Sequence, residues 1–232
     1  MSWVEHAIWW HIYPLGLCGA PIREPDTAPG PRLRRLLGWL DYAVELGCSG
    51  LLLGPIFASQ SHGYDSLDLF RIDPRLGDEA DFAELVSQCR ERGLRILLDG
   101  VFSHVGSEHP DVRHALTQGP GSPAGKLFDI DWQHPGGPRP QVFEGHSSLV
   151  RLNHSSQEAV DLVVRVMDHW LDRGIDGWRL DAAYSVPPGF WSRVVERVRP
   201  RHPDAWLLGE VLHGDYCAFV AESGIDSVTQ YE

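Results

Sequence analysis

The sequence is short of positive charge and of long apolar segments. Among its 232 residues, 20 are lysine or arginine and 32 are aspartate or glutamate, so the formal net charge is −12. This surplus of negative charge argues against nucleic acid or an anionic membrane surface as a partner. No apolar run approaches the length that a membrane-spanning helix needs, which argues against membrane insertion.

Cysteine is also scarce, and no two cysteines have the CxxC spacing of many metal and redox sites. The four are Cys18, Cys48, Cys89 and Cys217. Each lies in or near an apolar or helical run, so we interpret them as reduced packing residues. A secretory signal is not expected, because Glu5 and His6 replace a basic region and the apolar run stops at Pro14. With 43% hydrophobic residues, the chain is predicted to be a globular, cytoplasmic enzyme or binding domain.

What the sequence does contain is a regular alternation of strand-like and helix-like segments. Short apolar or β-favouring runs predict strands at residues 7–13, 50–55, 94–99, 175–181, 205–210 and 225–231. Apolar residues at helical spacing predict helices between them, at residues 33–46, 79–92, 156–173, 188–199 and 215–222. A Pro/Gly-rich loop precedes the first helix, up to about Pro31. This alternation predicts a parallel α/β fold, either a doubly wound sheet or a (β/α)8 TIM barrel.

Two observations favour the barrel. No GxGxxG motif follows any strand, which weakens the nucleotide-binding version of a doubly wound sheet. Polar residues gather instead at the carboxyl ends of strands: residues 62–65 after the second, Asp99 and His104 at the third, Asp181 at the fourth and Glu210 at the fifth. That distribution is typical of a barrel whose loops at one face carry the chemistry.

Asp181 and Glu210 are the candidate catalytic residues. They end adjacent predicted strands, so their side chains can converge over one ligand, and paired carboxylates at such a place suit glycoside hydrolysis. For a retaining pair we expect the carboxyl groups to lie within roughly 5–5.5 Å of each other. Arg179 points to the same side of the strand as Asp181 and would keep it ionised and oriented. The alternative is a structural ion pair beside two unrelated surface acids.

Residues 103–152 have a different texture, rich in Pro, Gly, His and Ser and without apolar periodicity. A segment of this length inside a compact domain is usually functional or a small inserted subdomain. We therefore predict barrel residues 1–102, an inserted subdomain B at 103–152, and a continued barrel at 153–232, up to about the sixth strand.

Four segments resemble motifs of glycoside hydrolase family 13, the α-amylase family, in the same order along the chain. They are residues 62–65 (HGYD), 99–104 (DGVFSH), 177–183 (GWRLDAA) and 209–211 (GEV). Residues 103–152 resemble the subdomain that this family carries after its third strand. The resemblance covers nearly the whole chain. It implies a (β/α)8 barrel and a glycosidase that acts on α-glucosidic bonds of α-glucans or oligosaccharides by a retaining double displacement.

The resemblance also implies catalytic roles. Asp181 would be the nucleophile and Glu210 the general acid/base. Arg179 would hold Asp181 in its orientation, and Asp99 is expected to be structural, paired with Arg179.

For the substrate, the resemblance implies four further residues. Tyr64 would stack on the apolar face of the sugar ring. His62 and His104 would hydrogen-bond sugar hydroxyls, with an ordinary structural histidine as the alternative for each. Asp65 would bind a terminal glucose hydroxyl.

Departures from the family pattern carry their own expectations. Ser103 stands where the family usually has an asparagine that helps to bind calcium, and Tyr184-Ser185 stand where the classical amylases show Lys-His. A hydroxyl is a poor ligand for a hard cation, so we expect no required cofactor and no tightly held calcium. The last catalytic aspartate, in an Asn-His-Asp motif after the seventh strand, has no counterpart. We therefore expect a barrel that is incomplete at its C-terminus, and near inactivity of these 232 residues alone.

Two other functions remain open at this point. One is an α-glucosyl transferase or isomerase of the trehalose synthase type, in which a sugar replaces water as the acceptor. The other is a carbohydrate-binding relative without turnover, which the missing aspartate favours. In each case the partner is an α-glucan or α-glucoside.

Overall fold

The centre of the molecule is one sheet of parallel strands. The computed structural model describes residues 3–22 and 28–231. Its sheet contains, in spatial order, β1 (Trp9–Ile12), β2 (Gly50–Leu53), β5 (Arg95–Gly100), β11 (Gly177–Leu180), β12 (Trp206–Gly209) and β13 (Ser227–Val228). Each neighbouring pair is parallel. The spatial order equals the chain order, as in a barrel and unlike a doubly wound sheet, whose order reverses. The predicted barrel topology is confirmed as a run of six strands.

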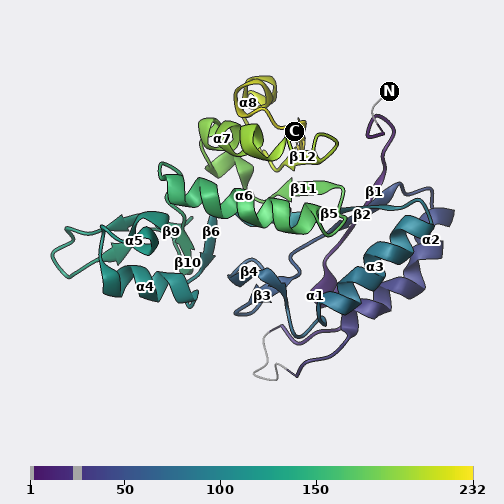
Figure 1. The fold of residues 1–232 in the computed structure, drawn as a ribbon, viewed down its shortest axis with the longest axis horizontal. Helices are drawn as coiled ribbons and strands as arrows, with labels where there is room; N and C mark the ends of the chain where they lie inside the picture. The colour runs from purple at the N-terminus through teal and green to yellow at the C-terminus, as the bar shows by residue number, and fades with distance from the viewer. Residues whose placement is uncertain (1–2, 23–27, 232) are drawn as a thin grey trace.

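A helical segment connects each strand to the next, as parallel pairing requires. These segments are η1 (Arg32–Trp39) with α2 (Leu40–Glu45), α3 (Glu79–Glu91), α6 (Gln157–Leu171), α7 (Pro188–Val198) and α8 (Tyr216–Ser223). Successive helices pack together, with α6 against α7 and α7 against α8. Figure 1 shows these three, in green to yellow, stacked on one side of the strands. Across the described residues, none of the helices combines the length and apolar character needed to cross a membrane.

Alternation along β11 separates the core from the site. Trp178 and Leu180 are completely buried, and the Trp178 ring lies against Phe57 and Phe102. Arg179, between them, points to the opposite side of the sheet because successive side chains of a strand alternate. The apolar face is therefore covered by helices, while the other face carries the charged residues.

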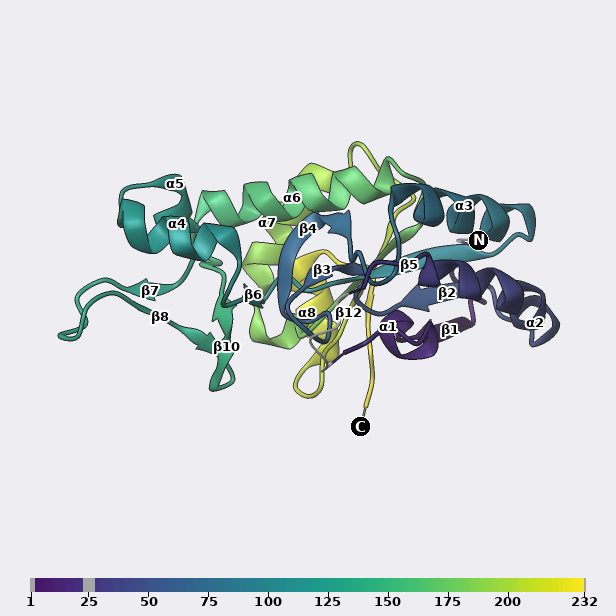
Figure 2. The ribbon, with the colours of Figure 1, turned by 90° about the horizontal axis from the view of Figure 1, so that it is seen from below.

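The segment after the third barrel strand folds as a small subdomain of its own. It contains β6 (His104–Gly106), α4 (Pro110–Gln118), α5 (Pro123–Leu127), β7 (Ile130–Asp131), β8 (Arg139–Pro140), β9 (Val142–Phe143) and β10 (His146–Arg151). Strands β6, β10 and β9 form an antiparallel sheet. Figures 1 and 2 both place this insert at one end of the molecule, beyond α6. Its division from the barrel at residues 103 and 152 stays a prediction.

Several local features differ from the expectation. Residues 32–39 form a 3₁₀ helix before the short α2; Leu33 and Leu36, both buried, are three residues apart, which suits three residues per turn. The sixth strand, β13, is shorter than predicted. The helix α1 (Pro14–Leu17) interrupts the predicted Pro/Gly loop, and residues 23–27 of that loop lie outside the described residues. The second strand is followed by a hairpin of β3 (Phe57–Ser59) and β4 (Ser66–Ile72).

Candidate active site

The ends of three adjacent strands bring four charged residues together. In the register of the sheet, Arg179 of β11 lies level with Asp99 of β5. Asp181 and Glu210 directly follow β11 and β12, and the backbone N–H of each donates to a carbonyl of the preceding strand, at 3.0 and 2.9 Å. The four side chains therefore sit at the carboxyl-terminal edge of the sheet, where barrel enzymes place their chemistry.

Arg179 is the centre of this charge cluster. Its Nη1 donates to both carboxylate oxygens of Asp99, at 2.6 and 2.7 Å, and to Oδ1 of Asp181 at 2.9 Å. Its Nη2 lies 2.5 Å from Oε1 of Glu210. The predicted pairing of Asp99 with Arg179 is confirmed. Asp181 and Glu210 converge because both contact the same planar guanidinium, although the separation of their carboxyl groups stays a prediction.

The cluster holds one cation and three carboxylates in a largely buried place. Burial raises the pKa of Asp99 and of Asp181; Arg179 opposes the shift, and the neighbouring carboxylates add to it. Burial would lower the pKa of Arg179, but the carboxylates raise it above its ordinary value, so the guanidinium stays charged. From the sequence, only the attraction between Arg179 and Asp181 was expected to act on the pKa of Asp181. In the structure, burial and like charges outweigh that attraction.

Glu210 is tied to the turn that follows Asp181. Its Oε2 accepts the backbone N–H of Ala182 at 2.9 Å, and the Tyr231 hydroxyl donates to Oε1 at 3.3 Å. Ala182 has a φ of 46°, a left-handed conformation that costs an L-residue about 1–2 kcal/mol. Backbone strain of this kind concentrates at functional sites. Here it turns the N–H of Ala182 toward the second catalytic candidate.

The predicted sugar-binding residues of the second-strand loop are divided between two environments. The half-buried Tyr64 reaches the charge cluster, its hydroxyl lying 3.4 Å from Oδ2 of Asp99. His62 is partly exposed, with Nε2 at 3.7 Å from Asp65. Asp65 is buried and accepts the backbone N–H and the hydroxyl of Ser61, at 3.1 and 2.5 Å. The structure thus joins Tyr64 to the site and engages Asp65 within its own loop; their contacts to sugar stay predictions.

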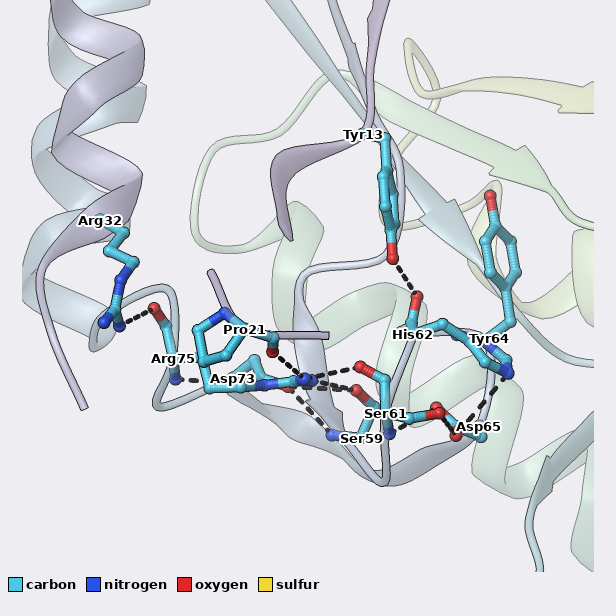
Figure 3. Close-up of polar contacts among 10 residues, drawn as sticks. All are labelled: Tyr13, Pro21, Arg32, Ser59, Ser61, His62, Tyr64, Asp65, Asp73 and Arg75. Atoms are coloured by element: carbon cyan, nitrogen blue, oxygen red, sulfur yellow. Dashed lines mark hydrogen bonds and ion pairs between the residues drawn. The ribbon is translucent and has the colours of Figure 1, made fainter. Parts of the chain in front are cut away.

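A buried arginine that no motif marked holds this loop in place. Arg75 donates to both oxygens of Asp73 at 2.8 and 2.7 Å, and to the backbone carbonyls of Ser61 at 2.6 Å and Pro21 at 2.9 Å. Figure 3 shows this network, with the ring of Tyr64 pointing away from it. Arg75 therefore fixes the base of the loop that presents Tyr64. The sequence signal was an arginine two residues after an aspartate.

Both ring nitrogens of His104 are engaged by the protein. Nδ1 lies 2.7 Å from the hydroxyl of Ser103, and Nε2 lies 3.0 Å from the backbone carbonyl of Tyr64. The ring packs on Phe143 of the insert, with centroids 4.5 Å apart. Burial lowers the pKa of His104 to about 4, so the ring is neutral near pH 7. These contacts support the structural alternative for His104, and its bond to a sugar hydroxyl stays a prediction.

Both serines at the place where the resemblance puts calcium are engaged by the protein. The Ser103 hydroxyl is bonded to His104, and the Ser185 hydroxyl donates to the Ala182 carbonyl at 2.7 Å. A cavity of about 230 Å³ between Ser103 and Ser185 is also lined by Arg151, whose positive charge opposes a cation, and by the carboxylate-bearing Glu144. In the described part of the chain, no cluster of three His, Cys, Asp or Glu residues is placed to hold a metal.

Two residues that the sequence analysis missed also face the charge cluster. Partial burial, and then the positive charge of Arg179, lower the pKa of His11 in β1. Glu144, in the turn between β9 and β10, accepts the hydroxyl of Tyr184 at 2.6 Å. A strand position predicted nothing specific for His11, and Glu144-Gly145 carried only the signal of a turn.

These features define a parallel βα-barrel domain with a carboxylate pair at its carboxyl-terminal face and an insert after the third strand. The chain belongs to the α-amylase family, since residues 33–232 match the family described as "Alpha amylase, catalytic domain".

Named relatives agree with this assignment. The cyclomaltodextrinase of Geobacillus thermopakistaniensis (strain MAS1) is 33% identical over 249 residues, covering 99% of this chain and 42% of the relative. The intracellular maltogenic amylase of Bacillus subtilis (strain 168) is 33% identical over 228 residues, covering 91% and 39%. The ligand-free cyclic α-maltosyl-(1→6)-maltose hydrolase of Arthrobacter globiformis superposes with a TM-score of 0.78 at 29% identity, covering 91% and 52%. The chain spans about two fifths of the length of the curated relatives it matches.

Proposed function

We propose that this protein cleaves α-glucosidic bonds of α-glucans or short α-glucosides with retention of configuration. The observation that carries the proposal is the meeting of Asp181 and Glu210 on the guanidinium of Arg179 at adjacent strand ends. The names of the relatives, a cyclomaltodextrinase and a maltogenic amylase, support this substrate class and favour hydrolysis over transfer. The word "intracellular" in one of those names supports the predicted cytoplasmic location.

In the first step, a carboxylate oxygen of Asp181 attacks the anomeric carbon. The bond from that carbon to the leaving oxygen breaks, and the leaving oxygen takes the proton of Glu210. The products are a glycosyl ester on Asp181, an ionised Glu210 and a free sugar. Arg179 supports this step because it contacts both carboxylates and stabilises the ionised form of Asp181.

In the second step, water gives a proton to Glu210 and its oxygen attacks the anomeric carbon. The ester bond breaks, which restores the ionised Asp181 and the protonated Glu210. A sugar hydroxyl in place of water would give the transferase reaction, so the ratio of transfer product to hydrolysis product distinguishes the two.

The test is covalent trapping in the protein expressed with its full reading frame. A fluorinated α-glucosyl donor should add one glycosyl group, detected by intact mass, and Asp181→Asn should abolish the addition because an amide is a poor nucleophile. The matched control is Asp204→Asn. Asp204 is exposed and lies just before the amino-terminal end of β12, so this variant should be trapped like wild type. Trapping that persists in Asp181→Asn would assign the nucleophile elsewhere.

A further inference from the structure

The turn between β9 and β10 carries an acidic side chain to the charge cluster. Phe143 pairs with His146, so Glu144 and Gly145 form a two-residue hairpin turn. Both have positive φ, 48° and 81°, as a type I′ turn requires. Glycine and asparagine suit this conformation, whereas a glutamate is strained in it. The side chain of Glu144 is exposed.

The carboxylate of Glu144 is held by the barrel itself. Its Oε1 accepts the Tyr184 hydroxyl at 2.6 Å, and no second hydrogen bond to Glu144 is formed within the described residues. Tyr184 lies in η2 (Ala183–Ser185), three residues beyond Asp181, and its ring lies 6.0 Å from that of His213 in the loop after β12. Three loops therefore meet here. One of them presents a carboxylate oxygen that remains available to accept.

The position of Tyr184 shows which side of the site this is. The backbone N–H of Tyr184 donates to the backbone carbonyl of Glu210 at 3.1 Å. In the proposed reaction Glu210 protonates the leaving oxygen, so the leaving sugar lies on its side. Tyr64 comes from the loop on the other side of Asp181, beyond β5. Glu144 is thus placed toward the leaving sugar.

We propose that Glu144 is a specificity-determining residue that binds hydroxyl groups of the sugar on the leaving-group side of the scissile bond. This inference rests on the proposed function. Tyr184 orients the carboxylate through Oε1, and the other oxygen accepts from the sugar, since a carboxylate bonds well to hydroxyls. The same sugar position receives the acceptor in a transfer reaction, so Glu144 also favours sugar over water as acceptor.

The charge of Glu144 gives a second, independent readout. Asp181 is faced by Arg179 of its own strand, Asp99 of β5, Glu210 of β12, Tyr64 of the second-strand loop, Tyr184 of η2 and Glu144 of the insert. Burial raises the pKa of Asp181, and Glu144 adds to the shift. Removing the charge of Glu144 lowers that pKa, so the acid limb of the pH profile moves to lower pH.

The experiment compares two donors that differ only in the leaving group, in the protein expressed with its full reading frame. When its maltosyl group is transferred, maltotriose releases glucose as the leaving group. α-Maltosyl fluoride releases fluoride and places no sugar near Glu144. At pH 7, Glu144→Gln should lower kcat/KM for maltotriose by about tenfold, the effect of one charged hydrogen bond. For α-maltosyl fluoride at pH 7 it should change little, while the acid limb moves to lower pH.

One further variant separates the charge of Glu144 from its orientation, and a second serves as the control. Tyr184→Phe keeps the charge of Glu144 but removes the hydrogen bond that orients it. The kcat/KM for maltotriose should therefore fall, while the acid limb of the pH profile stays nearer to that of wild type. Glu108→Gln, an exposed glutamate of the same insert, is the matched control and should behave like wild type with both donors.

Equal losses on both donors, or no loss on either, would overturn the role of Glu144. Wild-type protein that turned over neither donor would count against the proposed function instead. In that case, calorimetric titration with maltotriose still decides the inference, which requires weaker binding by Glu144→Gln than by Glu108→Gln.

Discussion

The side chain of Arg179 contacts three carboxylates from three adjacent strand ends. It is buried with Asp99, Asp181 and Glu210 around it, so the net charge of the group is negative while all three acids are ionised. A buried charge is costly unless it is paired, and removing one partner of a buried pair leaves the others uncompensated. Arg179 therefore has two expected roles, which are to stabilise this edge of the sheet and to position the two proposed catalytic carboxylates.

We predict that Arg179→Met destabilises the protein by about 3–5 kcal/mol near pH 7, measured by urea denaturation, because the carboxylates lose their counter-ion. Arg197→Met is the matched control. Arg197 pairs with Asp161 on the surface, with both side chains more than two fifths exposed, and the loss should stay below about 1 kcal/mol. Equal losses in the two variants would contradict the account of the charge cluster.

The loss of stability in Arg179→Met should depend on pH, and the direction follows from the sign of the pKa shifts. Burial raises the pKa of Asp99 and Asp181, so the folded state binds more protons than the unfolded state as pH rises above the ordinary carboxyl range. The stability contributed by these groups is therefore present at low pH and is lost as pH rises through the raised values. Without Arg179, the carboxylates lose their counter-ion, so the loss of stability with rising pH is larger. The deficit of Arg179→Met should accordingly shrink as the pH is lowered toward about 4.

At the scale of elements, the strands and their order could be predicted, because short apolar runs between helical patterns leave little choice. The pairing of Asp99 with Arg179 was expected from the resemblance to the α-amylase family, and the structure places the two residues level on adjacent strands. Helices α4 and α5 were missed, although each begins with a proline preceded by a capping side chain, His109 and Ser122. Glu144 could not be found from the sequence, since its proposed role depends on a contact with Tyr184, 40 residues away.

The loop that presents Tyr64 gives a prediction at this scale. Arg75→Met leaves the carbonyls of Ser61 and Pro21 without their donor, so residues 59–65 should exchange amide hydrogens roughly tenfold faster. The measurement is hydrogen exchange read by mass spectrometry. Arg71→Met on β4, where the arginine is exposed, is the matched control. Unchanged exchange in Arg75→Met would mean that the loop is held by other contacts.

At the scale of the whole molecule, the insert and the barrel meet around Ser103 and Ser185. Arg151 and Glu144 both line the cavity between Ser103 and Ser185, and the hydroxyls of the two serines are hydrogen-bonded within the protein. Protein groups connect the two parts directly, since the ring of His104 packs on Phe143 and the Tyr184 hydroxyl donates to Glu144.

We predict that a chelator leaves the melting temperature unchanged, and that calcium added afterwards does no more than the same concentration of magnesium. A tightly bound ion would stabilise the folded state by a few kcal/mol, which corresponds to a loss of roughly 5 °C or more on its removal. Such a loss, reversed by calcium and not by magnesium, would contradict the prediction.

The order of the strands also bears on how the protein is made. Chain order and sheet order coincide, so a nascent chain leaving the ribosome can add each strand to the edge of those already present. Asp99 emerges 80 residues before Arg179, and until then its carboxylate has no guanidinium beside it on the next strand. The third strand can dock early only with Asp99 protonated or hydrated. Emergence of Arg179 from the ribosome is thus the point at which the centre of the sheet can close around Asp99.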